Sequence, residues 1–246
     1  MNWLNVPEDV AARVLARRGT LHPFADFDPA RTALVVIDLQ NGFMDDRVGH
    51  AVCPMAREIV PNVNRLAHAI RRAGGGVFWV LNTHDAACLT EWSVMHGMST
   101  AEGRAKRTAA MSEGTEGHRL WPLLEVQPED EQVRKYRYSA FLPGASDLPN
   151  RLRARGFDTV IITGTVTNIC CESSARDAMM TNFKVIMVSD ANAASNMREH
   201  EASLIAFYLT FGDVMDTDFV MNRLAAVIPG NGRHPMMTPR PQTVAV

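Results

Sequence analysis

Three stretches of the sequence place a carboxylate, an ammonium group and a thiol at or just after runs that resemble β-strands. Asp38 follows the run TALVVI, Lys135 ends the run QVRK, and Cys170 follows the run TVIIT after a short polar turn. A cysteine with a base and a cation beside it can attack a carbonyl carbon and form a covalent intermediate. The three residue types therefore indicate nucleophilic hydrolysis of a carbonyl compound, if the fold brings them together.

The stretch around Cys170, TVIITGTVTNICCESSARDA, has the pattern of a buried strand, a sharp turn and a helix. We expect the strand at residues 159–163, ended by Gly164, and a helix that starts near Cys170. The free N–H groups and the dipole of a helix start favour thiolate over thiol, and the same N–H groups can hold an oxyanion. The alternative interpretation is that Cys170 is a small buried side chain, as free cysteines often are.

Cys171 has a different predicted role from its neighbour. Small side chains recur along the helix at i, i+3, i+4 and i+7, namely Cys171, Ser174, Ala175 and Ala178. A stripe of this kind suits close packing against a sheet. We therefore expect Cys171 to face the core and Cys170 to face the open end of the sheet.

The elements that must position these residues alternate between strand and helix patterns. Further strands are predicted at residues 32–37, 77–81, 184–189 and 213–215, the last at a sheet edge, and helices at residues 7–18, 54–73, 147–155, 198–211 and 218–226. This alternation predicts right-handed crossovers and a parallel sheet, whose carboxyl ends border the active-site crevice of open α/β sheets. The predicted fold is a Rossmann-like three-layer α/β/α sandwich with a mostly parallel central sheet.

The 246 residues suit one large domain with terminal extensions, and an apolar content of 46% is enough for a sizeable core. We predict an N-terminal helical arm at residues 1–30, a hydrolase domain at 31–227 and a C-terminal tail at 228–246. Within the domain, residues 85–117 lack a sustained period, so we expect loop and short helix that cap the substrate. The alternative for this segment is an exposed surface insertion.

Charge and cysteine usage exclude several classes of protein. The net charge of −2 and the absence of a basic run argue against nucleic acid as a partner. No apolar run approaches membrane-spanning length, and Glu8, Asp9 and Arg13 interrupt any signal-peptide core near the N-terminus. The four cysteines show no CxxC spacing, which favours a reducing cytoplasm. These observations predict a cytoplasmic protein that acts on neither nucleic acid nor membrane.

Three motifs give the chain a specific resemblance. VVIDLQNGF around Asp38, KYRYSAF around Lys135 and GTVTNICCESSARDA around Cys170 stand in the order and at about the spacing of the isochorismatase-like family of cysteine hydrolases. The chain resembles this family from about residue 32 to about residue 225. The resemblance implies a catalytic triad of the three residues on a parallel-sheet α/β fold. It also implies a homo-oligomer, either a dimer or a tetramer.

The resemblance further implies a cis peptide bond between Thr165 and Val166, with the backbone N–H groups of Val166 and Cys170 forming an oxyanion hole. Asp38 would take the thiol proton, Lys135 would stabilise the charges, and Cys170 would attack the carbonyl carbon. The protonated carboxyl would then pass its proton to a leaving amine before water hydrolyses the thioester.

Within the family, the sequence is most similar in motif to ureidoacrylate-type and carbamoyl-cleaving amidohydrolases. This implies cleavage of a C–N bond in a small amide or ureido acid with release of ammonia. The alternatives are an isochorismatase-type vinyl ether hydrolase, against which the cysteine counts, and a catalytically silent binding protein. The predicted substrate-binding residues are Gln40, Phe43, Asn82, Trp92 and Tyr138; Trp121 is a further candidate wall, and Arg104 and Lys106 are further candidate partners for a carboxylate or carbonyl.

A metal is not expected. Nicotinamidases of the family carry an Asp-x-His motif with further histidines after the second strand, whereas this chain has Asn82, Thr83 and His84, and its next histidine is His96. Because the aspartate is missing, we predict no metal, no cofactor and no activity on nicotinamide. His84 is then interpreted as a residue at the pocket mouth or on the surface.

Overall fold

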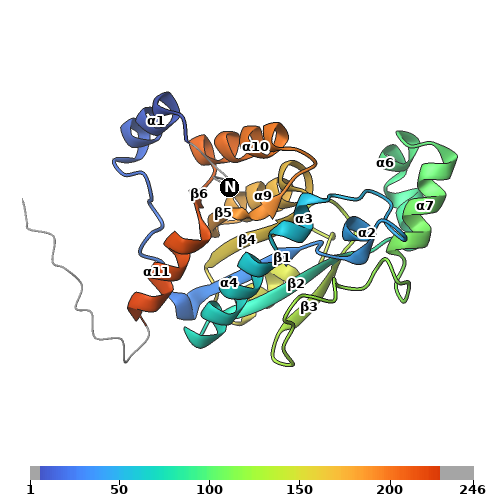
Figure 1. Ribbon diagram of the computed structural model, residues 1–246, viewed down its shortest axis with the longest axis horizontal. Helices are drawn as coiled ribbons and strands as arrows, with labels where there is room; N and C mark the ends of the chain where they lie inside the picture. Colours follow the sequence, from blue (N-terminus) through green and yellow to red (C-terminus); the bar gives the residue numbers. More distant parts are fainter. Residues whose placement is uncertain (1–5, 228–246) are drawn as a thin grey trace, which may run out of the picture.

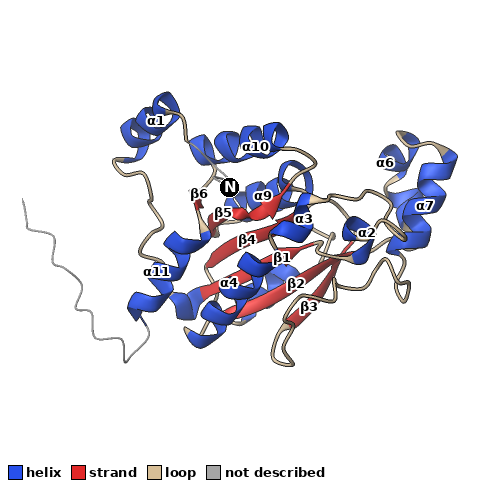
Figure 2. Ribbon diagram, in the orientation of Figure 1, coloured by secondary structure: helices blue, strands red, loops and turns tan. Residues whose placement is uncertain are grey.

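A six-stranded sheet forms the centre of the molecule. The structure, a computed structural model, describes residues 6–227, so residues 1–5 of the predicted arm and the predicted tail at 228–246 lie outside the described residues. The strands are β1 (Thr32–Ile37), β2 (Gly76–Asn82), β3 (Glu131–Lys135), β4 (Thr159–Thr165), β5 (Lys184–Ala193) and β6 (Asp213–Met215). Their order is β3-β2-β1-β4-β5-β6 and every pair is parallel, which confirms the predicted fold class (Figure 2).

Helices cover both faces of this sheet (Figure 1). The α-helices are α1 (Glu8–Arg18), α2 (Asn41–Met44), α3 (Met55–Glu58), α4 (Val60–Arg72), α5 (Cys88–Glu91), α6 (Ser93–Gly97), α7 (Ala101–Met111), α8 (Leu148–Ala154), α9 (Glu172–Met180), α10 (Met197–Thr210) and α11 (Thr217–Val227). Leu34 and Val36 of β1 pack into a core with α4 and α11, whereas Val35 packs into a second core with α8, α9 and α10. Alternate residues of the buried strand thus serve opposite faces.

Gly164 lies inside β4, although the sequence predicted that it ends the strand. The strand continues to Thr165, which pairs with Ala193 of β5. Gly164 has φ of 121°, and a Cβ at this position would collide with the backbone of Ile37 on β1. Only glycine allows this close approach, so its role is strand packing and not strand termination.

The predicted helix at residues 54–73 is also interrupted. The structure has a short α3 and a separate α4, with Ile59 between them and Pro61 in the first turn of α4. Proline lacks an N–H group and its ring clashes with the preceding turn, so it is tolerated at a helix start but not inside one.

The segment 85–117 contains more helix than predicted. It holds α5, α6 and the 11-residue α7, whose N-cap Thr100 accepts a hydrogen bond from the N–H of Gly103. The buried residues of α7 are Ala110 and Met111, at its C-terminal end. These helices form a lobe at one end of the molecule (Figure 1). We refer to residues 85–117 as the cap segment.

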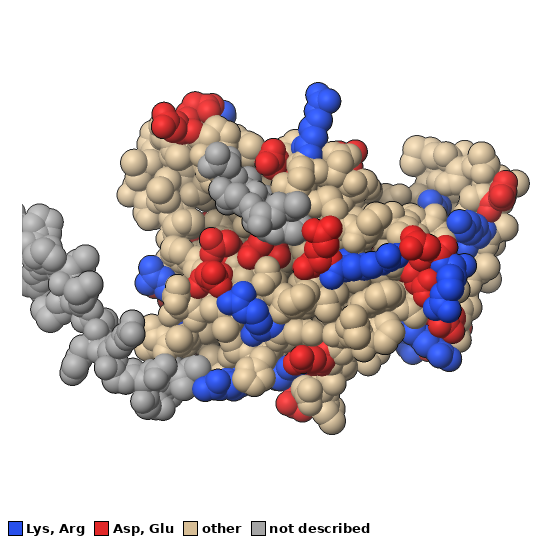
Figure 3. Space-filling view, viewed as in Figure 1, with Lys and Arg blue, Asp and Glu red and all other residues tan. Residues whose placement is uncertain are grey.

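The N-terminal helix α1 packs on the body of the molecule. Val10 and Val14 are buried, and Arg17 and Arg18 donate hydrogen bonds to the carbonyls of Leu209 and Gly212 at the end of α10. No helix within residues 6–227 combines the length and apolar character that crossing a membrane requires. On the face shown in Figure 3, basic and acidic side chains are interspersed.

Candidate active site

The structure brings Asp38, Lys135 and Cys170 together at the carboxyl end of the sheet. Asp38 follows β1, Lys135 is the last residue of β3, and Cys170 lies in a π-helical turn, Thr167–Cys171, that follows β4. The Lys135 Nζ lies 2.9 Å from the Asp38 Oδ2 and 3.4 Å from the Cys170 Sγ, and it donates to the carbonyl of Arg137 at 3.1 Å. All three side chains are buried. The ammonium group therefore sits between the carboxylate and the sulfur.

The electrostatics of this cluster differ from the sequence expectation for the thiol. Burial, reinforced by the negative charge of Asp38 and opposed by Lys135, raises the pKa of Cys170 to about 12. The prediction that the helix start favours thiolate is therefore wrong for the resting state, because desolvation disfavours the charged form more strongly than the local dipole favours it. Cys170 is a thiol at neutral pH and needs a base.

Asp38 and Lys135 are shifted in directions that suit that need. Burial raises the pKa of Asp38, although Lys135 and the hydrogen bonds of Cys170 and Asn82 oppose the shift. For Lys135, burial alone would lower the pKa, but the charges of Asp38 and Cys170 outweigh it and the pKa is raised. The lysine thus stays charged, and the carboxylate is a stronger base than an exposed one.

The turn that carries Cys170 is held by several contacts. The peptide bond between Thr165 and Val166 is cis. The Val166 carbonyl accepts from the N–H groups of Ile169 and Cys171 at 3.0 and 3.3 Å. The helical turn begins at Thr167 and continues into α9, so Cys170 lies within a π-turn and not in the first turn of an α-helix. N–H groups at the start of a helix have no acceptor within it, so they can serve a bound oxygen.

Two residues that fix this turn were not found from the sequence. His200 Nδ1 and the Thr167 hydroxyl are hydrogen-bonded at 2.9 Å, and Ser203 donates to the Thr167 carbonyl at 3.4 Å. Both residues lie in α10, about 30 residues further along the chain. The sequence of α10 did not predict this role, because no sequence pattern distinguishes a polar residue on the buried face of a helix from one on its exposed face. Cys171, in contrast, is fully buried as expected.

Asn82 is the predicted substrate-binding residue that lies closest to the triad. It ends β2 directly opposite Lys135 in the strand pairing, and its side-chain hydrogen bond lowers the pKa of Asp38. Its Oδ1 is buried and has no hydrogen-bond partner among the described residues. This oxygen is available to a substrate N–H group.

Gln40 and Phe43 are placed differently from the prediction that they contact substrate. The Gln40 Nε2 donates to the carbonyls of Asn82 and His118 at 3.2 and 2.8 Å, and its Oε1 accepts from the Asn82 N–H at 2.8 Å. The amide is committed to the main chain and positions the end of β2. Phe43 packs in the core and against the ring of His50, at 4.9 Å between centroids.

Trp92 and Tyr138 form an aromatic cluster with His84. The rings of Trp92 and Tyr138 are edge to face at 4.7 Å between centroids, and His84 stacks on Trp92 at 6.3 Å. His84 is only 4% exposed, so its interpretation as a surface residue is wrong. Trp121 lies away from this cluster, because it packs on the core and under Arg57.

The residues present do not fit the metal motif of the nicotinamidases. Position 82 offers a neutral amide in place of a carboxylate, and within residues 6–227 no group of three or more His, Cys, Asp or Glu side chains is arranged to hold a metal ion. A divalent cation prefers at least one anionic ligand or a closed set of imidazoles. The described residues therefore offer no ligand set for a metal ion.

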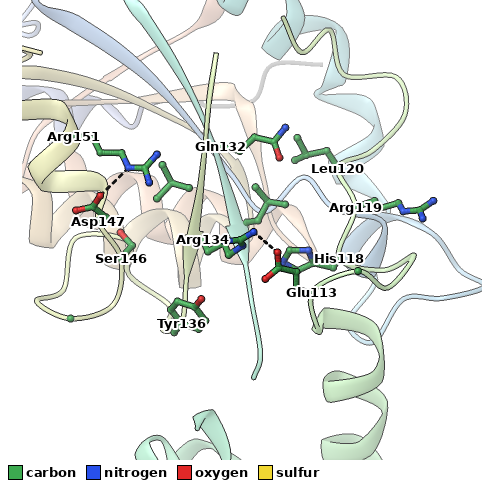
Figure 4. A pocket seen from close by; sticks show the side chains of 14 residues that line it. Glu113, His118, Arg119, Leu120, Gln132, Arg134, Tyr136, Ser146, Asp147 and Arg151 are labelled. Carbon is green, nitrogen blue, oxygen red and sulfur yellow. Dashed lines mark hydrogen bonds and ion pairs between the residues drawn. The ribbon is translucent and has the colours of Figure 1, made fainter. Parts of the chain in front are cut away.

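A cavity of about 730 Å³ is lined by residues of β3 and of the loops that follow α7 and β3, together with Leu81 of β2, and includes none of the three triad residues. Figure 4 shows its lining, in which Arg134 pairs with Glu113 and Arg151 pairs with Asp147, whereas no ion pair of residues 6–227 involves Arg119. It has no nucleophile paired with a base. The buried triad, and not this surface cavity, is the candidate active site.

The doubly covered parallel sheet belongs to the α/β class of folds, and it buries a thiol, a lysine and a carboxylate together at its strand ends. The model of the isochorismatase domain matches residues 32–219, most of the chain, and the protein therefore belongs to the isochorismatase family of hydrolases. This finding confirms the resemblance seen in the three sequence motifs.

Relatives and solved structures agree with this membership. The chain is 30% identical over 203 residues to the ureidoacrylate amidohydrolase RutB of Methylobacterium radiotolerans, covering 77% of this chain and 78% of that protein. It is 33% identical over 190 residues to nicotinamidase 3 of Arabidopsis thaliana, covering 76% and 85%. A cysteine hydrolase structure from Pseudomonas syringae pv. phaseolicola 1448A matches with a TM-score of 0.73 at 28% identity, covering 82% of this chain and 96% of that one.

Proposed function

We propose that the protein is a cysteine amidohydrolase. It cleaves the C–N bond of a small amide or of a ureido or carbamoyl acid and releases ammonia through a thioester intermediate. The observation that carries this proposal is the buried Lys135 Nζ, 2.9 Å from Asp38 and 3.4 Å from the sulfur of Cys170. A nucleophile, a base and a fixed positive charge are the groups that such a reaction requires.

The first half of the reaction forms the thioester. The Cys170 thiol loses its proton to the carboxylate of Asp38 as its sulfur attacks the carbonyl carbon. The resulting oxyanion is held by the N–H groups of Val166 and Cys170 at the start of the helical turn. When the C–N bond breaks, Asp38 returns the proton to the leaving nitrogen and ammonia departs. Lys135 keeps a positive charge beside the sulfur and the carboxylate throughout.

The second half hydrolyses the thioester. A water molecule gives one proton to Asp38 as its oxygen attacks the same carbonyl carbon, and the same N–H groups hold the new oxyanion. Collapse of this species breaks the C–S bond and releases the acid. The proton on Asp38 then returns to the sulfur and restores the Cys170 thiol. The raised pKa of the carboxyl suits it to carry this proton in both directions.

The relatives support an amide substrate and not a particular one. One is named a ureidoacrylate amidohydrolase and the other a nicotinamidase. The Asn82 amide in place of an aspartate counts against a metal-dependent nicotinamidase. An isochorismatase-type vinyl ether hydrolase has no need for the Cys170 nucleophile, and a silent binding protein has no need for an intact triad.

Several properties accompany this proposal. The hydrolase domain spans residues 31–227, with the cap segment over its site, and the protein works as a cytoplasmic homo-oligomer without a nucleic acid partner or a cofactor. Static light scattering of the purified protein tests the oligomer. A mass equal to the 27.2 kDa chain at micromolar concentration refutes that part of the proposal.

An ammonia-release screen tests the activity itself. The panel contains primary amides, ureido acids, nicotinamide and a vinyl ether substrate, and Cys170→Ala is the matched inactive control. Ammonia release from a small amide or ureido acid by the natural protein, and its loss in the variant, is the expected result. Turnover of the vinyl ether alone, or no turnover of any compound, refutes the proposal.

A further inference from the structure

Arg107 of the cap segment carries a positive charge that acts on His84, on which the charge of Lys135 acts as well. It is half-buried on α7, and it was not among the residues that the sequence suggested for binding a carboxylate. Those were Arg104 and Lys106, of which Arg104 is occupied: it donates to the carbonyls of His96 and Ser99 at 3.2 and 2.7 Å, at the end of α6.

The cap segment holds the C-terminal end of α7 against the end of β2. The N–H of His84 donates to the Met111 carbonyl at 3.0 Å, and the Ser112 hydroxyl donates to the His84 carbonyl at 3.1 Å. Arg107 precedes Met111 by four residues, so the two share one face of the helix. Met111 is fully buried, which places the Arg107 side chain on the inner face of α7.

The contacts of Arg107 are with neutral groups. Its Nη1 donates to the Met95 Sδ at 2.9 Å and to the Ser99 hydroxyl at 3.3 Å. Among the ion pairs of residues 6–227, none involves this guanidinium. A sulfur atom and a hydroxyl are weak acceptors for a guanidinium, whose fork of donors matches a carboxylate.

Buried histidines with unpartnered ring nitrogens surround it. His84 and His96 are each 4% exposed, and their rings meet edge to face at 5.7 Å between centroids. Within the described part of the chain, the His84 Nδ1 and both ring nitrogens of His96 have no hydrogen-bond partner, and neither does the His50 Nε2. A buried polar atom without a partner costs free energy, so several in one place point to a polar ligand.

These imidazoles are uncharged at neutral pH. Burial, followed by the charge of Arg107, lowers the pKa of His84 to about 3 and that of His50 to about 4, and it lowers the pKa of His96 as well. The wall of the site therefore offers neutral N–H donors beside one permanent positive charge. An anion entering this region meets Arg107 as its counter-charge.

We propose that Arg107 binds the carboxylate of the substrate, with the imidazoles of His84 and His96 as neutral donors beside it. This inference rests on the proposed amidohydrolase function and restricts the substrate to an acid. Asn82, beside the triad, and His84 are two residues apart, and two residues of extended chain span about 7 Å. The scissile carbonyl and the carboxylate then belong to one short linear molecule, such as a ureido acid.

The test compares an acid with its neutral ester. N-carbamoyl-β-alanine and its methyl ester present the same ureido group, so only the carboxylate differs. For Arg107→Gln we expect KM for the acid to rise roughly tenfold to a hundredfold, because one charge-assisted contact is lost. We expect kcat for the acid and both constants for the ester to stay within about twofold, and Arg107→Lys to recover part of the loss. Arg104→Gln, one turn earlier on α7, is the matched control and should not change the acid-to-ester ratio.

A binding measurement separates failure of this inference from failure of the proposed function. Titration calorimetry of the Cys170→Ala variant with N-carbamoyl-β-alanine needs no turnover. Binding that weakens tenfold or more when Arg107→Gln is added supports the inference even if no ammonia is released. Three results overturn it: no binding to Cys170→Ala, equal binding with and without Arg107, or a stoichiometric metal ion in the purified protein that is lost in His84→Ala.

Discussion

Substituting Lys135 by methionine tests the electrostatic account of the candidate active site most directly. Methionine is similar in length and removes the charge of a fully buried side chain, together with its hydrogen bond to the Arg137 carbonyl. In Lys135→Met, the Asp38 carboxylate loses the ammonium group 2.9 Å away. Breaking a buried ion pair in this way costs about 3 to 5 kcal/mol, because one charge is left without compensation. This is a large part of the total stability of a typical domain, about 5 to 15 kcal/mol.

The pH dependence of this loss follows from the pKa of Asp38. Burial already raises that pKa with the lysine present, and removal of the lysine raises it further. The folded state then binds a proton more tightly than the unfolded state, in which the pKa is about 3.9. Stability therefore falls as pH rises from the unfolded value through the folded value. We expect Lys135→Met to be more destabilised at pH 8 than at pH 5, relative to the natural protein.

The double variant Asp38→Asn/Lys135→Met removes both charges. Its loss in the free energy of unfolding should be smaller, by at least about 2 kcal/mol, than the summed losses of the two single variants, since contacting charges couple by up to about 3 kcal/mol. Activity should stay absent in all three variants. Urea unfolding followed by tryptophan fluorescence at pH 5 and pH 8 measures these values. Two results would show that Asp38 and Lys135 are not a buried charge pair. One is a loss of unfolding free energy below about 1 kcal/mol in Lys135→Met at pH 8, and the other is a loss in the double variant that equals the sum of the single losses.

Three further predictions concern the neighbouring groups. Cys170→Ala should lower kcat at least about 10³-fold in the ammonia assay. Because the Cys171 side chain only packs in the core, Cys171→Ala should mainly lower the unfolding midpoint. Equal losses of kcat in the two folded variants would contradict the assignment of Cys170 as the nucleophile. The value of kcat/KM should fall at acid pH as Asp38 is protonated, and this fall should lie above the ordinary carboxyl range because the pKa of Asp38 is raised. The value of kcat/KM should not rise near pH 8 or 9, because the pKa of Cys170 is about 12. An alkaline rise centred near pH 8.5 would mean that a free thiolate reacts. Exhaustive chelation should leave the rate unchanged, and a rate that collapses and returns with zinc would refute a metal-free site.

The sheet was predictable from the sequence because each strand has a recognisable pattern in its own residues. The run TALVVI before Asp38 and the run VIIT before Gly164 are apolar on both faces, and this is the pattern of a strand covered by helices on either side. Since the carboxyl ends of parallel strands lie at one edge of a sheet, the three strand ends place a carboxylate, a lysine and a thiol at that edge, and the family resemblance implies that they form a triad.

The charge state of the thiol was not predictable in the same way. A helix start lowers the pKa of a cysteine, and this effect can be read from local sequence. Burial raises the pKa, and it depends on how α9, α10 and β5 close over Cys170, which no local pattern encodes. Gln40 shows the same limit: its position after β1 suggested a pocket residue, but its partners are main-chain groups 42 and 78 positions away.

The cap segment was hardest to predict because its main helix has almost no apolar stripe. In AEGRAKRTAAM only the last residues, Ala110 and Met111, reach the core, and Met111 is fully buried. That single anchorage, together with the bonds between Met111, Ser112 and His84, means that replacing residues 86–117 by a flexible linker would remove core packing as well as pocket walls. Selectivity must therefore be tested by point substitutions on the inner face of α7, where Arg107 lies, because these alter the proposed wall of the site while the strand ends that carry the triad stay in place.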